Sequence, residues 1–233
     1  MIKIRRQFLA ITIASLFLSV AIKAQEVNQL DANGKRTGVW RKYYENGKLR
    51  YQGQFKNGKE IGVFEFYAPH SSYPSIIKEF SENSDTAVVK FYEKTRLKTI
   101  GKMIGKNREG KWTYYFSDGT KIFSEENYIN GKLNGILKNY YANGNLTEET
   151  FYKNGQKNGL SKIYTEKGIL IEEVLYENGK LNGAAKYFDL KGNLKEKGMY
   201  KDGAREGKWE FYVDGELSDK PKERKTHSIK KKQ

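Results

Sequence analysis

The amino-acid sequence predicts an all-β protein, in which tandem β-hairpin repeats form one elongated antiparallel meander, a solenoid-like sheet. Three observations support this fold class. A glycine recurs at multiples of 24 or 25 residues, an aromatic residue stands five positions after each one, and Asn-Gly or Asp-Gly pairs interrupt the β-compatible runs. A fixed period in this range is typical of repeat architectures, and Asn-Gly between such runs is typical of hairpins.

The recurring glycine marks the start of each unit. Successive gaps are 24, 48, 25, 24, 24 and 24 residues, and the gap of 48 hides a degenerate unit that starts at Thr86. The chain therefore holds about eight units of 24 residues. The second and third are degenerate, and the last is cut short. The marker glycines are Gly38, Gly62, Gly110, Gly135, Gly159, Gly183 and Gly207.

Each unit is predicted to be a hairpin. In the first unit a β-compatible run spans 39–44, the turn pair Asn46-Gly47 follows, and a second run extends to Phe55. Asn-Gly supplies the positive φ of a type I′ turn. Later units carry the same kind of pair, so about sixteen strands are expected. These pairs are Asn143-Gly144, Asp118-Gly119 and Asp214-Gly215.

A second turn connects each hairpin to the next one. Its sequence in the first unit is Asn57-Gly58, and a glycine recurs there because a β-carbon is strained at positive φ. We expect these glycines to be structural. They are Gly58, Gly131, Gly155, Gly179 and Gly203.

The aromatic residue five positions after each marker is predicted to form a structural ladder across neighbouring hairpins. Stacked rings would help a thin sheet to bury enough apolar area. The alternative is a stacking platform for bases or sugars. The ladder consists of Tyr43, Tyr67, Phe91, Tyr115, Tyr140, Tyr164, Phe188 and Tyr212.

Further aromatic residues fall on the opposite face if side chains alternate strictly. A large exposed aromatic patch would mark a partner-binding site. The alternative is that a bulge or the roll of the sheet turns these residues inward, and the three tryptophans at one repeat position favour that reading. The candidate patch consists of Phe64, Phe66, Trp112, Tyr114, Phe116 and Tyr141.

The segment 68–85 breaks the rhythm of the repeat. Pro69 and Pro74 argue against a central strand at 68–75, because proline cannot donate to a hydrogen-bond ladder. The segment is either a tolerated surface loop or a functional projection, and both interpretations remain open.

The two ends of the chain are predicted to lie outside the fold. Residues 1–24 combine a basic start, a 15-residue apolar stretch and small residues, which predicts a secretory signal peptide and a periplasmic or extracellular location. The alternative, a membrane anchor, requires about 20 apolar residues. The repeat array then covers 25–217. The tail 218–233 is rich in Lys and Arg and is predicted to be disordered.

The net charge of the chain limits the classes of partner that can be expected. Cleavage after residue 24 removes four basic residues and takes the formal net charge from +15 to +11. The positive charge is spread widely, and no helix is predicted that could enter a DNA groove, so specific nucleic-acid binding is not expected. Attraction to acidic surfaces remains open.

Catalytic chemistry is not predicted. The sequence has no Cys and two His, which leaves no thiol nucleophile, no evident triad and no metal-ligand spacing. The recurring Glu-Glu pairs sit on adjacent strand positions, so their carboxylates point to opposite faces. We therefore expect no enzyme, no cofactor and no metal.

The first unit reads G-x-W-x-x-Y-Y-x-N-G-x-L, and the connecting turn reads Y-x-N-G-K-x-x-G. This pattern resembles the MORN-type repeat variant, and its tandem recurrence over 33–217 resembles the YwqK antitoxin family. The resemblance implies an elongated binding platform, contact with anionic lipid, or an immunity partner that neutralises a toxin.

The resulting functional hypothesis is an exported, non-catalytic scaffold that binds another protein. The alternatives are an antitoxin for one partner toxin and a peripheral binder of anionic membrane or envelope polymer. An open end strand can also pair with a second copy, so an end-to-end homodimer is a further expectation.

Overall fold

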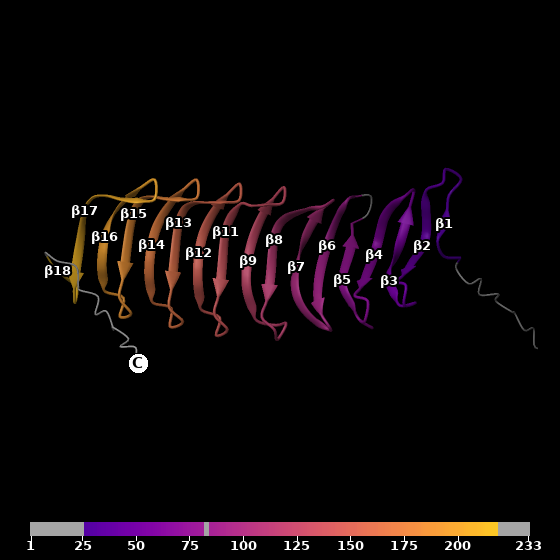
Figure 1. The fold of residues 1–233 in the computed structure, drawn as a ribbon, viewed down its shortest axis with the longest axis horizontal. Helices are drawn as coiled ribbons and strands as arrows, with labels where there is room; N and C mark the ends of the chain where they lie inside the picture. Colours follow the sequence, from indigo (N-terminus) through magenta and orange to yellow (C-terminus); the bar gives the residue numbers. More distant parts are fainter. Residues whose placement is uncertain (1–25, 82–83, 219–233) are drawn as a thin grey trace, which may run out of the picture.

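The computed structural model describes residues 26–81 and 84–218, which form one antiparallel sheet of 18 strands (Figure 1). The predicted signal peptide and nearly all of the predicted basic tail lie outside the described residues. The strands are β1 (Gln29–Leu30), β2 (Arg36–Tyr43), β3 (Leu49–Lys56), β4 (Lys59–Tyr67), β5 (Pro74–Phe80), β6 (Thr86–Glu93), β7 (Arg96–Ile104), β8 (Asn107–Tyr115), β9 (Ile122–Ile129), β10 (Lys132–Leu133), β11 (Gly135–Tyr140), β12 (Leu146–Lys153), β13 (Gln156–Tyr164), β14 (Leu170–Glu177), β15 (Lys180–Phe188), β16 (Leu194–Lys201), β17 (Ala204–Val213) and β18 (Glu216–Ser218).

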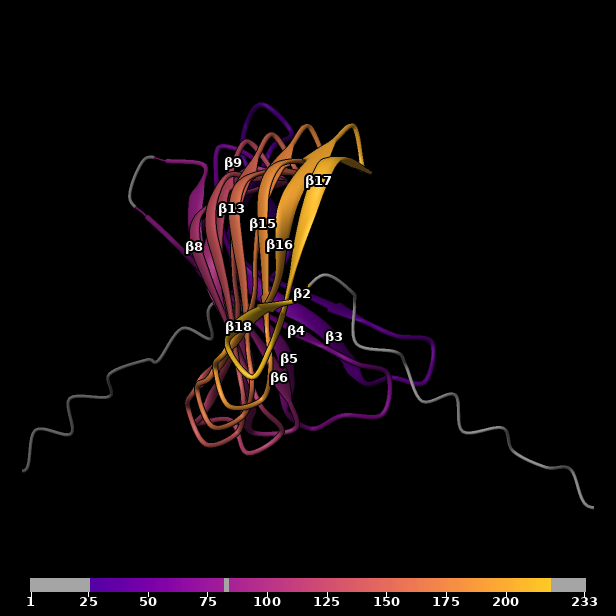
Figure 2. The same ribbon diagram turned by 90° about the vertical axis from the view of Figure 1, so that its left-hand side faces the viewer.

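The strands follow one another across the sheet in sequence order. Each pairs antiparallel with the next, and β10 and β11 share one position beside β9. The sheet does not close: β1 and β18 lie at its opposite ends, and the end-on view shows how it twists between them (Figures 1 and 2). The predicted hairpin meander is therefore confirmed. Sixteen strands belong to the eight units, and the other two are the short β1 and β10, the latter separated from β11 at Asn134.

Most of the connections along one long edge of the sheet are two-residue turns. Asn57 and Gly58 both have positive φ, 53° and 81°, which is the signature of a type I′ turn. The five predicted turn glycines all adopt this conformation, with φ of 81° at Gly58, 78° at Gly131, 87° at Gly155, 84° at Gly179 and 89° at Gly203.

The turns at the other edge differ from the prediction. At Asn46-Gly47 only the glycine has positive φ, 76°, and its N–H donates to the carbonyl of Tyr44 at 3.0 Å. This is a type I turn followed by a left-handed glycine, so the type I′ assignment is wrong here, at Asp118-Gly119 and at Asn143-Gly144. Instead, the Asn46 side chain donates to the carbonyl of Pro69, in the corresponding turn of the next unit, at 3.1 Å. Asp214-Gly215, with φ of 52° and 88°, does form the predicted turn.

The irregular segment also contains a strand whose first two residues, Pro74 and Ser75, fall in the stretch 68–75 where the prolines argued against a central strand. β5 begins at Pro74 and lies between β4 and β6, with Ile76 paired to Phe66 on one side and to Phe91 on the other. Proline is tolerated as the first residue of a strand, where a missing N–H interrupts little of the ladder. Only the part of the segment before Pro74 replaces a tight turn.

Replacing Gly155 with valine is expected to lower the free energy of unfolding by about 1–3 kcal/mol. No atom lies within 4 Å of the position of a new Cβ, so the cost comes from backbone strain at φ 87°. Gly155→Asn should cost less than about 1 kcal/mol, because asparagine tolerates this conformation. Urea denaturation of both variants checks the prediction, and equal stabilities of the two would contradict it.

Candidate interaction surfaces

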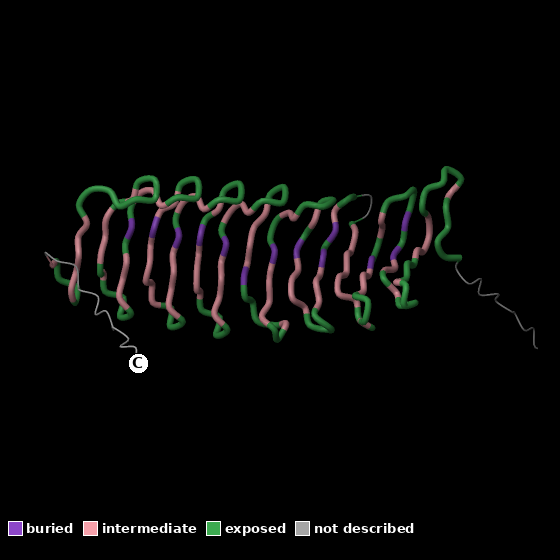
Figure 3. The backbone as a smooth tube through the Cα atoms, in the orientation of Figure 1, coloured by how far each residue is buried: buried purple, intermediate pink, exposed green. Residues whose placement is uncertain are grey.

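The strand register separates the side chains into two faces. Leu137 pairs with Thr150 and points to the face that we call the packed face, whereas Ile136 pairs with Phe151 and points to the opposite one, the open face. The buried residues lie on the packed face at mid-height along the strands, and the turns at both edges are exposed (Figure 3). Burial in this single layer is therefore confined to a belt along one face.

Large side chains on the packed face lie over small residues of the preceding strand. Trp112 is fully buried and covers Gly101, so closely that a Cβ atom there would overlap the indole ring. Phe64 covers Gly53 and Trp209 covers Gly198 in the same way. A flat ring on a glycine lets neighbouring strands share a core without a second layer of structure.

The middle units solve the same packing problem with medium-sized residues. Val174 pairs with Ala185, and both are fully buried. Thr150 pairs with Ser161, and their hydroxyl groups are hydrogen-bonded at 2.7 Å. The paired hydroxyls satisfy each other, which limits the cost of burying polar groups in this belt.

Each tryptophan carries an arginine four residues before it, and the two side chains stack. The distances from the guanidinium carbon to a ring centroid are 5.0 Å for Arg36, 4.5 Å for Arg108 and 3.8 Å for Arg205. Such contacts are attractive electrostatically and shield the ring from water. The R-x-G-x-W pattern occurs in the sequence three times and was the available signal for this stacking, which was not predicted.

Arg108 also anchors two tyrosines. It donates to the hydroxyl of Tyr114 at 2.5 Å and to that of Tyr128 at 2.9 Å, and Tyr128 donates to Glu126 at 2.5 Å. Burial, followed by hydrogen bonding to Tyr128 and Glu126, raises the pKa of Tyr114 far above its ordinary value. The phenols therefore stay neutral and act as structural links.

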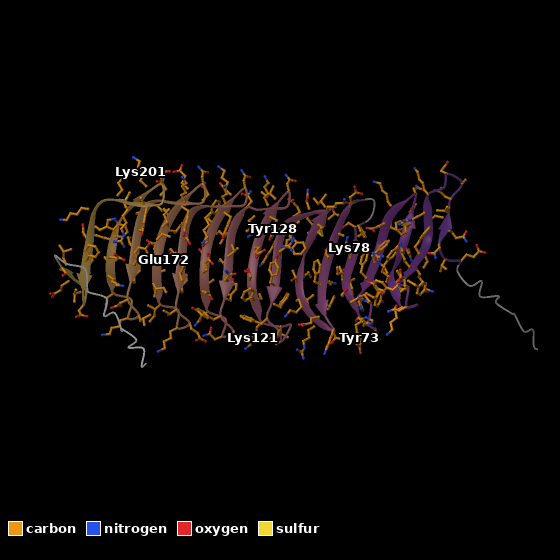
Figure 4. All side chains as sticks on the ribbon, in the orientation of Figure 1. Tyr73, Lys78, Lys121, Tyr128, Glu172 and Lys201 are labelled. Atoms are coloured by element: carbon orange, nitrogen blue, oxygen red, sulfur yellow. The ribbon has the colours of Figure 1, made fainter. Side chains whose placement is uncertain are left out.

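Two glutamates at equivalent positions of the packed face have opposite environments. Burial alone would raise the pKa of Glu148, but the Thr150 hydroxyl and the Lys157 ammonium lower it overall. Glu172, which Figure 4 labels, forms no hydrogen bond or ion pair with any residue of 26–81 or 84–218, and burial raises its pKa. Its carboxylate is thus the less well compensated of the two.

The two glutamates predict opposite pH-dependent effects. The folded-state pKa of Glu172 is raised, so its ionised form destabilises the fold, and Glu172→Gln is expected to increase stability at pH 7. The folded-state pKa of Glu148 is lowered, so Glu148→Gln is expected to decrease stability at pH 7. At pH 3 both carboxyls are largely protonated in the unfolded chain and both differences should shrink. Thermal unfolding at the two pH values checks this, and the same sign for both variants at pH 7 would contradict it.

The residues of the candidate aromatic patch do not form one exposed surface. Phe64 and Trp112 belong to the core, as the inward alternative anticipated, while Phe66 and Tyr114 are half-buried beside them. The other two serve local packing. The Phe116 ring meets that of Phe123 edge-on with centroids 5.3 Å apart, and the Tyr141 hydroxyl donates to the carbonyl of Tyr164 at 3.0 Å.

The predicted aromatic ladder is not the core of the sheet. Tyr43 is half exposed, and the other members are half-buried. In the described part of the chain no ring contact joins two successive members. The physical reason is a register shift beside the turn, for example between Lys42 and Tyr43 and between Asn139 and Tyr140, which displaces these rings toward the sheet edge. The belt of buried side chains lies three residues earlier, at the position of Trp112.

The open face carries an apolar stripe that was not predicted from the sequence. It crosses β11 to β16, and four of its side chains are 40–47% exposed: Ile136, Phe151, Leu160 and Met199. Leu175 and Ala184 complete it, since Leu160 pairs with Leu175 and Ala184 with Met199. An apolar residue directly after the marker glycine in these three units, where Lys111 and Lys208 stand in others, was the available signal.

A row of ion pairs borders the stripe on the same face. Glu149 pairs with Lys138 at 3.3 Å, and Glu173 pairs with Lys162 at 3.5 Å and with Lys186 at 3.1 Å. Between stripe and row lies a shallow groove of about 260 Å³, lined by Ile136, Glu149, Phe151, Leu160 and Lys162. An apolar surface with a charged border has the composition of a protein-binding site.

No centre for chemistry is evident in the described residues. Within 26–81 and 84–218, no group of three or more His, Cys, Asp or Glu side chains could hold a metal ion. His70 is exposed in the turn before β5, and His227 lies outside the described residues. The same described ranges contain no helix with the length and apolarity needed to cross a membrane.

The fold and its surfaces define an open, single-layer β-hairpin repeat protein with a unit of 24 residues. Four segments match the family model of the MORN repeat variant, namely 36–57, 133–154, 157–180 and 181–202. These four segments thus carry the MORN repeat variant, and each spans about one hairpin and its turn. A search of curated proteins found no match.

Proposed function

We propose that this repeat protein is a non-catalytic scaffold that binds another protein along the apolar stripe of its open face. The observation that carries the proposal is the continuity of the stripe over six neighbouring strands. Isolated exposed apolar residues are common on protein surfaces, but a contiguous row with a charged border is typical of interaction sites.

The stripe also defines the partner. Ile136, Phe151 and Leu160 present branched and aromatic groups beside a shallow groove, so the partner should offer apolar side chains of its own. The neighbouring row holds both Lys and Glu, so charged groups of either sign can be matched at the border. A flat, extended contact of this kind suits a protein surface better than a small molecule.

Leu160→Ser is expected to weaken the binding of such a partner at least about tenfold, because one buried leucine contributes about 1.5–3 kcal/mol. Val63→Ser is the matched control, since Val63 occupies the same repeat position in a unit outside the stripe. The full chain and both variants serve as baits in extracts of the source organism, and the captured protein is then titrated in purified form. A partner that binds Leu160→Ser and wild type equally would overturn the proposal.

The location and the partner's identity are further proposals. The sequence of residues 1–24 supports export, so the encounter would take place in the periplasm or outside the cell. The family resemblance supports an immunity role, in which the partner is a toxin and binding neutralises it. Co-expression with neighbouring toxin candidates tests that role, and it is wrong if none of them is neutralised.

Contact with anionic membrane or polymer is the second candidate function, and one feature of the sheet favours it. Lysines gather at the edge with the two-residue turns, where Figure 4 places Lys201. Binding through such exposed charges must weaken as salt screens them. Retention by anionic vesicles that is unaffected by 0.5 M salt would contradict this candidate.

A further inference from the structure

The sheet ends in a half-strand on each side. At one end β1 pairs with the start of β2, through Gln29 with Thr37 and Leu30 with Arg36, and Asn28 extends the contact through hydrogen bonds with the Val39 carbonyl and the Arg41 N–H. At the other end β18 pairs only with the last residues of β17, through Leu217 with Tyr212. Within the described residues, the outer side of β2 is therefore uncovered only at its end, at Lys42 and Tyr43, and the outer side of β17 is uncovered toward its beginning.

The two half-strands occupy complementary parts of one position in the repeat. In a complete unit β16 fills this position: its Leu194 pairs with Phe188 near one edge, as Leu217 pairs with Tyr212. Near the other edge its Tyr200 pairs with Arg205 of the next strand, as Leu30 pairs with Arg36. β18 thus matches the beginning of a full second strand, and β1 matches its end.

The direction of the chain fits as well. β17 and β2 are both first strands of a hairpin and run the same way across the sheet, and each half-strand is antiparallel to its own neighbour (Figure 1). β18 and β1 therefore run in the same direction. Placed end to end, they would fill a single strand position without a clash of polarity.

Apolar side chains are exposed at the uncovered ends, although their repeat equivalents are not. Leu30, Tyr43 and Leu217 are 52–65% exposed. The equivalents of Leu217 inside the array, such as Leu170 and Leu194, are only partly exposed because another strand lies beside them. Edge strands with free backbone groups and apolar side chains readily pair with another chain.

We propose that copies of this protein associate head to tail, with β18 of one copy and β1 of the next sharing one strand position between β17 and β2. The sheet would then continue from copy to copy with its own repeat spacing. The complementary half-strands and their common direction favour head to tail over either symmetric pairing.

A head-to-tail contact does not close on itself, so it generates filaments instead of a defined dimer. Sedimentation velocity of the full chain over a wide range of concentration is expected to show a mass that keeps rising beyond the dimer. A chain that stays monomeric at every concentration, because its own residues cover the edges, would overturn the proposal.

Two variants block one end each, with little expected effect on the fold because both positions are exposed. Leu30→Lys blocks the β1 end and Leu217→Lys the β18 end, so each alone should be monomeric. Mixed together they should form a dimer that grows no further, since one copy offers a free β18 end and the other a free β1 end. Leu190→Lys, at an exposed turn position, is the control and should assemble like wild type.

The mixing experiment separates this geometry from a symmetric one. A symmetric contact between two β18 ends would leave Leu30→Lys dimeric on its own, and a symmetric contact between two β1 ends would leave Leu217→Lys dimeric. Either result would overturn the head-to-tail proposal. Circular dichroism and thermal unfolding of each variant verify that the sheet itself is intact.

Discussion

Gly101→Val is expected to lower the free energy of unfolding by about 3 kcal/mol or more, enough to unfold the central units. The Trp112 ring lies directly on Gly101, and even a single Cβ atom would overlap it. Trp112 has no room to retreat, because it is fully buried with Ala87 and Val89, and Phe91 packs against this cluster. Urea denaturation followed by tryptophan fluorescence and circular dichroism measures the loss.

The chain itself suggests the control for this substitution. Val174 and Ala185 form the same kind of cross-strand pair as Gly101 and Trp112, with the larger residue on the other strand. The double variant Gly101→Val with Trp112→Ala installs that pair and should recover part of the stability that Gly101→Val alone loses. If the double variant is no more stable than Gly101→Val, then the complementary sizes of residues 101 and 112 do not stabilise the contact between these two strands.

Trp112→Ala alone is expected to cost about 3–5 kcal/mol, the range found when large buried aromatic side chains are removed. The variant loses the contact with Gly101 and the ring beneath Arg108, and it leaves a cavity next to Tyr128. Thermal and urea unfolding give the magnitude.

Trp209→Ala provides the comparison in a terminal unit. Trp209 likewise lies on a glycine, Gly198, and stacks with an arginine, Arg205. It is only half-buried, however, because it lies near the end of the sheet. Its removal should cost clearly less than that of Trp112. Equal losses would indicate that the depth of burial within the array does not determine these energies.

The fold was predictable because its determinants are local and repeated. The period of 24 residues, the Asn-Gly pairs and the β-compatible runs require only neighbouring residues, and they predict the hairpins that the structure shows. The turn at Asn46-Gly47 was assigned the wrong type, because the same dipeptide serves two turn geometries and the loop length decides between them. The structural effect of Pro74 likewise depended on its context, because Pro74 begins β5, which pairs with β4 on one side and β6 on the other.

The assignment of faces could not be made from strict alternation. Each unit contains register shifts, for example between Thr150 and Tyr152, and every shift changes which residues share a face. Phe64 and Trp112 were therefore counted toward an exposed patch although they form the core. The open-face stripe was missed for the related reason that Ile136 and Leu160 follow a marker glycine whose bulge was not anticipated.

The accessibility of two adjacent residues tests the central claim, that one face of a single-layer sheet is packed and the other is open. Leu160 is 41% exposed on the open face, and Ser161 is 1% exposed on the packed face. The chain has no cysteine, so Leu160→Cys and Ser161→Cys each introduce the only thiol. We predict that a thiol reagent labels Leu160→Cys at least roughly 100-fold faster, because labelling of Ser161→Cys requires local opening. In urea both variants should be labelled at the same rate, and this measurement is the reference. Equal labelling rates in the folded state as well would contradict the account.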